Sequence, residues 1–201
     1  MKYTHYIWDF DGTLFDTYPI ILKGFMDTLN TYQIQADEKE IYYLLKSKSS
    51  KAIAEKYGLD FAEFTRVFKS FEAKDTREPV PFEGAKAILE KVIAEGGKNY
   101  ILTHRDTPGT KELLATYELT DYFVEIIGSE RPFPRKPAPD SLLYLIDTYK
   151  METSQAVMIG DRFMDIDAGK AAGINTVFFD QDHLLEDVSA TQNVTHLLDI
   201  D

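Results

Sequence analysis

The chain has 201 residues, of which 44% are apolar and 28% are charged, a composition that supports a buried core and argues against disorder. Its 34 acidic residues outnumber its 22 basic ones, giving a formal net charge of −12, and no dense lysine and arginine cluster of the kind that binds nucleic acid interrupts this excess. The absence of cysteine excludes disulfides, thiolate metal sites and cysteine nucleophiles, and it fits a reducing cytosol.

The first residues, MKYTHYIWDFDG, lack the apolar stretch of a signal peptide, and no run of about 18 apolar residues follows anywhere. We therefore expect a cytoplasmic protein with no membrane partner. Residues 3–9 are rich in aromatic and β-branched side chains and are followed by the turn-forming pair Asp11-Gly12. This pattern predicts a buried first strand that ends in a loop.

From Tyr18 to about Glu78 the pattern changes, because apolar residues recur at three- and four-residue spacing, which is typical of helices that bury one face. The predicted helices of this stretch span residues 20–32, 38–45, 52–57 and 61–71. The stretch as a whole is therefore predicted to be helical.

After Pro79 and Pro81, short apolar runs alternate with segments of helical periodicity. The predicted helices span residues 85–95, 108–117, 140–149 and 165–172, and the predicted strands span residues 99–103, 123–128, 156–160 and 175–179. Alternating strands and helices specify a parallel sheet that is covered on both faces. The residues after Asp180 carry only a weak pattern.

The expected fold class is therefore α/β, with a Rossmann-like, doubly wound parallel sheet as its core. The helical stretch would break the alternation directly after the first strand, so we interpret it as an inserted all-helical cap. This gives a core domain of residues 1–16 and 80–201 and a cap domain of residues 17–79. In open parallel sheets, ligands bind beyond the carboxyl ends of the strands, where the strand order switches.

The first strand ends with two acids, Asp9 and Asp11, that can point into the same crevice. Neighbouring carboxylates repel each other, and a divalent cation with oxygen ligands is the simplest way to offset that repulsion. Two acids at a turn can also simply cap a loop. The pattern alone therefore leaves a metal site and a capped loop both open.

The ends of the later predicted strands add further polar residues. Thr103 offers a hydroxyl beside backbone N–H groups that could bind phosphate oxygens, although it could also cap a helix. Lys136, in a loop that leads into a helix, could place an ammonium beside developing phosphate charge or be merely solvated. Asp161 and Asp165 share one face of a turn, where they could bind a metal or favour a helix N-terminus.

Taken together in chain order, these residues resemble the four motifs of the haloacid dehalogenase superfamily, in its phosphatase branch with a helical cap after the first strand. The resemblance spans Ile7 to about Phe179. The motifs are matched by Asp9-Phe10-Asp11-Gly12-Thr13, by Thr103, by Lys136-Pro137, and by Gly160-Asp161-Arg162-Phe163-Met164-Asp165.

The resemblance implies a mechanism for each matched position. Asp9 would attack phosphorus and form an aspartyl-phosphate, and Asp11 would protonate the leaving oxygen and then activate water. Mg²⁺ would be held by Asp9, the main-chain carbonyl of Asp11 and Asp161, with Asp165 in support. Thr103, Lys136 and nearby backbone N–H groups would bind the phosphoryl oxygens. The implied partner is a small phosphorylated metabolite.

Three alternatives follow from the same resemblance. Dehalogenases do not keep an acid at the position of Asp11, which argues against carbon–halogen cleavage. A β-phosphoglucomutase-like phosphotransferase has a cap loop similar to residues 45–51, but its histidine aligns at about Ile21 here. A binding or regulatory protein without turnover would be free to lose Asp9 or Asp11, and the intact acids argue against it.

Four residues outside the core motifs are candidates for contact with the substrate, and they depart from or extend the family pattern. Two follow the motif threonine and two lie in the predicted cap loop, namely His104, Arg105, Lys46 and Ser49. For Arg105, an ordinary surface salt bridge is an equal alternative to contact with the substrate. For Lys46 and Ser49, the equal alternative is a solvated polar turn.

Overall fold

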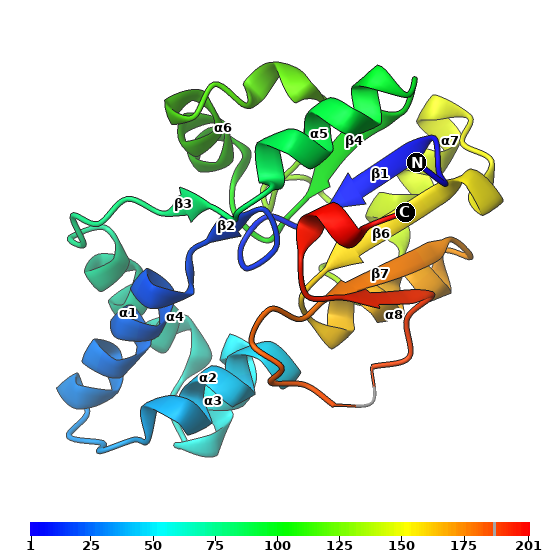
Figure 1. Cartoon of the computed structure of the whole chain (residues 1–201). Helices are drawn as coiled ribbons and strands as arrows, with labels where there is room; N and C mark the ends of the chain where they lie inside the picture. Colours follow the sequence, from blue (N-terminus) through cyan, green and yellow to red (C-terminus); the bar gives the residue numbers. More distant parts are fainter. Residues whose placement is uncertain (187) are drawn as a thin grey trace. The chain divides into compact units, whose positions relative to one another are not determined.

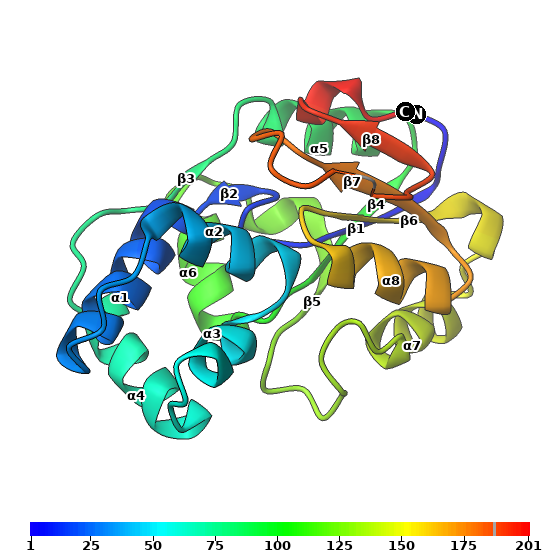
Figure 2. The same cartoon turned by 90° about the horizontal axis from the view of Figure 1, so that it is seen from below.

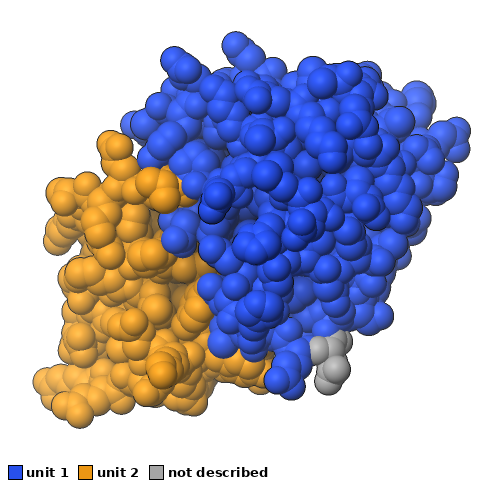
Figure 3. All heavy atoms as spheres, in the orientation of Figure 1, with its two compact units in different colours: residues 1–16, 81–201 blue, residues 17–80 orange. Residues whose placement is uncertain are grey.

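The computed structural model describes residues 1–186 and 188–201. The chain forms two compact units, coloured separately in Figure 3. Residues 1–16 and 81–201 form one, which we call the core unit, and residues 17–80 form the other, which we call the helical unit. Each unit contains its own cluster of buried apolar side chains.

The core unit is built on a six-stranded sheet in the order β5-β4-β1-β6-β7-β8, and every pair of neighbouring strands is parallel (Figure 1). Its strands are β1 (His5–Trp8), β4 (Lys98–Leu102), β5 (Phe123–Ile127), β6 (Ala156–Gly160), β7 (Asn175–Phe179) and β8 (Gln192–Val194). The chain leaves β1 toward β4 and leaves β6 toward β7, in opposite directions. The crevice between β1 and β6 is therefore the switch point of strand order, where α/β proteins bind ligands.

Helices cover both faces of this sheet. The strands carry apolar side chains on both faces, so that Trp8 packs in one cluster and its neighbour Ile7 in the other. One cluster includes side chains of α5 (Ala85–Ala94) and α6 (Thr107–Thr116), and the other includes side chains of α7 (Asp140–Tyr149) and α8 (Phe163–Ala171). Figure 2 shows α7 and α8 on the same side of the sheet. The predicted fold class, a doubly wound parallel α/β sheet, is confirmed.

Helix α8 packs unusually close to the strands below it. A Cβ atom added at Gly169 would lie 2.5 Å from Thr176 Cγ2 on β7 and 3.2 Å from Met158 Cβ on β6. Such a contact is too short for any side chain, so glycine is required where the helix crosses the strands. This close packing holds α8 directly against β6 and β7.

Short elements complete the core unit. Strands β2 (Phe15–Asp16) and β3 (Val80–Pro81) pair with each other where the chain leaves and rejoins the core unit. The 3-10 helices are η1 (Thr120–Tyr122), η2 (Thr153–Gln155) and η3 (Leu197–Asp199). Strand β8 and η3 lie after Asp180, where the sequence pattern indicated no element, because only scattered apolar residues such as Val194 and Leu197 anchor this segment to the core.

The helical unit consists of α1 (Tyr18–Thr31), α2 (Glu38–Ser47), α3 (Ser50–Lys56) and α4 (Phe61–Glu72). Its core is rich in aromatic side chains, with the rings of Phe25 and Phe68 stacked 4.4 Å apart. Side-chain caps start three of the helices, because Asp37, Ser49 and Asp60 each accept a hydrogen bond from a backbone N–H three residues later. Among the described residues, no helix combines the length and the apolar character that crossing a membrane requires.

Candidate active site

Three buried aspartates meet at the crevice between β1 and β6. Asp9 follows β1, and its N–H donates to the Ile159 carbonyl of β6 at 2.8 Å, which extends the strand pairing by one residue. Asp161 follows β6, and Asp165 lies in the first turn of α8. One carboxylate oxygen of each residue lies within 4.8 Å of the others, and we call this group the carboxylate cluster. Asp9 is 6% exposed, whereas the other two are fully buried.

Three residues to which the sequence assigned no individual role support this cluster. A Cβ atom added at Gly160 would lie 2.3 Å from Asp165 Cβ, so only glycine leaves room for the Asp165 side chain. The N–H of Arg162 donates to Asp165 Oδ2 at 3.1 Å, which fixes that carboxylate at the start of α8. The Thr13 hydroxyl donates to Asp161 Oδ1 at 3.4 Å. Glycine directly before an aspartate at a strand end is the sequence signal for the first of these contacts.

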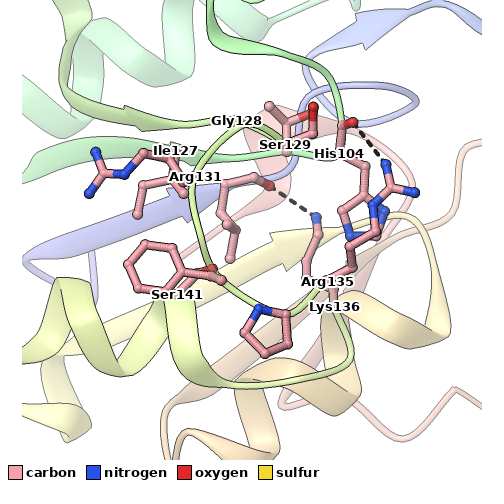
Figure 4. A pocket seen from close by; sticks show the side chains of 12 residues that line it. His104, Ile127, Gly128, Ser129, Arg131, Arg135, Lys136 and Ser141 are labelled. Atoms are coloured by element: carbon pink, nitrogen blue, oxygen red, sulfur yellow. Dashed lines mark hydrogen bonds between the residues drawn. The ribbon is translucent and has the colours of Figure 1, made fainter.

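Lys136 is buried against the cluster and contacts two of its members. Its ammonium nitrogen lies 2.8 Å from Asp9 Oδ1 and 2.6 Å from Asp165 Oδ1, and it donates to the Leu102 carbonyl at 3.0 Å. Three oxygen atoms thus lie within 3.0 Å of this ammonium nitrogen. Figure 4 shows Lys136 with this backbone hydrogen bond, on the segment that leads from β5 to α7.

Burial and neighbouring charges leave the pKa values of both Asp9 and Lys136 above their ordinary values. Burial, followed by the charges of Asp165 and Asp161, raises the pKa of Asp9 to about 8 despite the neighbouring ammonium. Burial lowers the pKa of Lys136, but Asp165 and Asp9 outweigh it and hold that pKa above its ordinary value. Three carboxylates beside one ammonium thus leave negative charge uncompensated.

This uncompensated charge makes the cluster a suitable site for a divalent cation. Carboxylate oxygens are the ligands that Mg²⁺ and Ca²⁺ prefer, and Mg²⁺ commonly takes one or two of them from the protein and completes its shell with water and substrate oxygens. The donor set of Asp9, Asp161 and Asp165 fits such an ion. The carboxylate of Asp11 lies outside this set.

Asp11 instead pairs with Arg105, which follows β4. Arg105 Nη2 donates to Asp11 Oδ1 at 2.8 Å, and Nε donates to the same oxygen at 3.2 Å and to Oδ2 at 3.4 Å. The two side chains keep 19% and 23% of their surface exposed, far more than the members of the carboxylate cluster. The surface salt bridge considered for Arg105 is therefore present, and its partner is the predicted acid.

Thr103 and His104 continue the same loop. Thr103 is buried, and its hydroxyl accepts a hydrogen bond from the Arg105 N–H at 3.0 Å. His104 Nε2 is buried and has no hydrogen-bond partner among the described residues. Burial, followed by the charges of Lys136, Arg135 and Arg162, lowers the pKa of His104 to about 2. Arg135 donates to the His104 carbonyl at 3.1 Å, as Figure 4 shows. A cavity of about 20 Å³, large enough for about one water molecule, lies beside these residues.

Three further polar residues outside the carboxylate cluster have local structural contacts. The cap of α6 is Asp106, which accepts a hydrogen bond from the Gly109 N–H at 2.8 Å. In the helical unit, Lys46 lies in the last turn of α2, with its ammonium 5.4 Å from the ring centre of Tyr18, and Ser49 caps α3. Both residues thus have local structural roles in the helical unit.

Comparisons with known proteins agree with this geometry. The model of the haloacid dehalogenase-like hydrolase family matches residues 6–179. Phosphoglycolate phosphatase from Rhodospirillum rubrum is 28% identical over 92% of this chain and 82% of its own length. Fructose-1-phosphate phosphatase YqaB from Escherichia coli is 27% identical over 88% of this chain and 96% of its own length.

A solved structure supports the same relationship. The crystal structure of a hydrolase from Streptococcus pneumoniae is 36% identical, covers 94% of this chain and 95% of its own, and superposes with a TM-score of 0.62. Both the sequence match and the shared fold extend over almost the whole chain. The chain therefore belongs to the haloacid dehalogenase-like hydrolase family and is an enzyme of its phosphatase branch.

Proposed function

We propose that the protein is a Mg²⁺-dependent phosphatase that hydrolyses a small phosphorylated metabolite through an aspartyl-phosphate on Asp9. The observation that carries this proposal is the buried cluster of Asp9, Asp161 and Asp165 with Lys136 at the switch point of the sheet. Asp9 is the most exposed member of the carboxylate cluster, which suits a nucleophile that must reach the substrate.

In the proposed reaction, a carboxylate oxygen of Asp9 attacks phosphorus while the bond between phosphorus and the leaving oxygen breaks. Asp11 donates a proton to that leaving oxygen and then takes one from the water that attacks the aspartyl-phosphate. The second attack releases inorganic phosphate and restores Asp9. Each turnover thus consumes one water and returns Asp11 to its protonated state.

The neighbouring residues would orient these groups. Lys136 binds one oxygen of Asp9 at 2.8 Å, which fixes the rotation of the nucleophilic carboxylate. The Thr103 hydroxyl and the adjacent backbone N–H groups would bind the phosphoryl oxygens. Mg²⁺, when held by Asp9, the Asp11 carbonyl and Asp161 with support from Asp165, supplies positive charge beside the phosphoryl group.

We further propose that the helical unit acts as the cap over this site, with hinges near Thr17 and Pro79. Closure of a cap excludes bulk water and positions the substrate, and mutations at hinges change kcat and KM together. The related phosphatases are named for phosphoglycolate and for fructose 1-phosphate, which are small phosphate esters with quite different leaving groups. The substrate proposed for this protein belongs to the same size class.

The test is phosphate release from p-nitrophenyl phosphate by the purified protein in Mg²⁺ and in EDTA, followed by a panel of phosphorylated metabolites. We expect release that requires Mg²⁺. An absence of metal-dependent release from every compound would contradict the proposal and favour a binding protein. Conversion of β-glucose 1-phosphate to glucose 6-phosphate without net phosphate release would instead identify a mutase. A crystal soaked with beryllium fluoride and Mg²⁺ should carry the fluoride complex on Asp9.

A further inference from the structure

The Asp11–Arg105 ion pair occupies the carboxylate that has to reach the leaving group. Two N–H groups of Arg105 bind Oδ1 of Asp11, at 2.8 and 3.2 Å, and one of them also approaches Oδ2 at 3.4 Å. A leaving oxygen that takes a proton from Asp11 must approach the same carboxylate within hydrogen-bond distance. The guanidinium and the leaving group therefore compete for the same position.

The backbones on both sides of this pair are fixed, so only side chains are free to rearrange. The Arg105 N–H donates to the Thr103 hydroxyl, and its carbonyl accepts from the Ser129 N–H, both at 3.0 Å. On the opposite side, the carbonyl of Phe10 accepts hydrogen bonds from three successive N–H groups of the loop that contains Asp11. A shift of the Arg105 side chain is therefore the simplest way to free Asp11.

A displaced Arg105 guanidinium would lie beside the leaving group, because Asp11 donates its proton there. Its side chain is only 19% exposed, so a new anionic partner beside it would favour its displacement from Asp11. The planar fork of an arginine matches a carboxylate, which is the group that it already binds on Asp11. A carboxylate on the substrate could replace the carboxylate of Asp11 with the same geometry.

We propose that Arg105 is a specificity residue that binds a carboxylate carried by the leaving group, and that this exchange lets Asp11 take up a proton from water, which it then donates to the leaving oxygen. The inference rests on the proposed phosphatase function and assigns its substrate class, small phosphate esters of hydroxy acids. A phosphate ester with an uncharged leaving group offers Arg105 no replacement partner. Such a substrate leaves Arg105 on Asp11 and is hydrolysed more slowly.

The test compares two substrates that differ in one group, phosphoglycolate with its carboxylate and ethyl phosphate with a methyl group in its place. For the wild-type enzyme in Mg²⁺, we expect kcat/KM to favour phosphoglycolate by about 100-fold, the range of a charge-assisted hydrogen-bonded pair. In Arg105→Gln, kcat/KM for phosphoglycolate should fall by about 100-fold, mainly through a higher KM. The ratio of kcat/KM for phosphoglycolate to kcat/KM for ethyl phosphate should then be about one. Arg105→Lys should keep part of the preference, because lysine retains the charge without the fork.

The matched control is Arg66→Gln on α4, because Arg66 also binds a carboxylate through two nitrogens, with Nε 2.8 Å and Nη2 2.6 Å from Glu63 oxygens. This variant should keep the wild-type preference. An equal loss for both substrates in Arg105→Gln, with the preference unchanged, would overturn the proposal and leave Arg105 as a residue that only positions Asp11. A wild-type enzyme that hydrolyses both substrates equally would also overturn it.

Two further measurements separate the possible failures. If the wild-type protein releases phosphate from neither substrate nor from p-nitrophenyl phosphate, the proposed function itself fails. If Arg105→Gln does not fold, as judged by circular dichroism and thermal melting, inhibition of the wild-type enzyme decides. Glycolate should then inhibit p-nitrophenyl phosphate hydrolysis at a concentration about 10-fold or more below that of ethanediol, its uncharged counterpart. Equal inhibition by the two would contradict the proposal.

Discussion

Two groups of opposite charges lie at the carboxyl edge of the same sheet, and they differ in burial. In the first, Lys136 contacts Asp9 and Asp165, and these three side chains are only 1–8% exposed. In the second, Arg105 contacts Asp11, and the side chains are 19% and 23% exposed. Each group combines a basic side chain with an aspartate that is proposed to act directly on the substrate.

The difference in burial assigns different physical roles to the two groups. Breaking a buried ion pair leaves a charge without water and is strongly destabilising, so the Lys136 group is expected to stay intact throughout the reaction. A partly exposed pair contributes little to stability, so the Asp11–Arg105 pair can exchange partners at small cost. The first group is a fixed scaffold for the nucleophile, and the second is a replaceable contact.

The largest expected effect is on catalysis by the buried group. Asp9→Asn removes the nucleophile and should lower kcat by about 10⁵-fold or more, comparable to the loss of other enzymatic nucleophiles. Steady-state phosphate release with p-nitrophenyl phosphate measures it. Asp27→Asn on α1 serves as the control and should keep full activity. Retained activity in Asp9→Asn would contradict the assignment of the nucleophile.

Lys136→Met tests whether the buried group is a scaffold. Removing the ammonium leaves Asp9 and Asp165 buried without compensation, which should lower the free energy of unfolding by about 3–5 kcal/mol in metal-free urea titrations. Added Mg²⁺ should recover more stability in this variant than in the wild type, because the ion then offsets the uncompensated carboxylates.

The control for that measurement is Lys150→Met. Lys150 lies 2.9 Å from Asp147, and both side chains are at least 80% exposed, so no measurable change in stability is expected. If the two lysine variants lost equal stability, the distinction between the buried and the exposed charges would be wrong.

Asp11→Asn examines the exposed pair in the same way. We expect kcat to fall by about 10²–10⁴-fold for alkyl phosphates, whose leaving oxygen needs a proton. The loss should be much smaller for p-nitrophenyl phosphate, because nitrophenolate leaves without one. The free energy of unfolding should change by less than about 1 kcal/mol, because the pair is partly exposed. A loss of stability as large as that of Lys136→Met would contradict the comparison.

The pH dependence of stability offers a further distinction. In metal-free protein the pKa of Asp9 is raised from 3.8 to about 8, so between these values the folded state holds a proton that the unfolded state has lost. Stability should therefore fall as the pH rises through this window, with a slope of at most about 1.4 kcal/mol per pH unit. Urea titrations in EDTA should find this contribution in the wild type and not in Asp9→Asn. Identical pH profiles would contradict it.

The sequence was sufficient to predict the frame of this site but not its side-chain pairing. Buried parallel strands are short apolar runs, and the ends of parallel strands share one edge, so Asp9, Lys136 and Asp161 could be expected close together. The contact between Arg105 and Asp11 joins residues 94 positions apart and depends on rotamers, which no local pattern encodes. Strand β8 was missed because its three residues carry too few apolar side chains for a periodic signal.

The supporting contacts of the cluster were equally hidden, and the smallest prediction concerns one of them. Thr13 is fully buried, and its hydroxyl donates to Asp161 Oδ1 at 3.4 Å. Thr13→Val keeps the shape of the side chain and removes this donor, which should cost about 1 kcal/mol of stability and lower kcat severalfold by loosening Asp161.

Thr110→Val is the matched control, because Thr110 is also fully buried but donates to a neutral carbonyl of Asp106 at 2.8 Å. Its cost in stability should be similar, while kcat should not change. Urea titrations and phosphate release on both variants separate the two effects. If Thr13→Val behaved like Thr110→Val in both assays, the Thr13 hydroxyl would not be needed to hold Asp161. The rigidity of the carboxylate cluster would then not depend on this hydrogen bond.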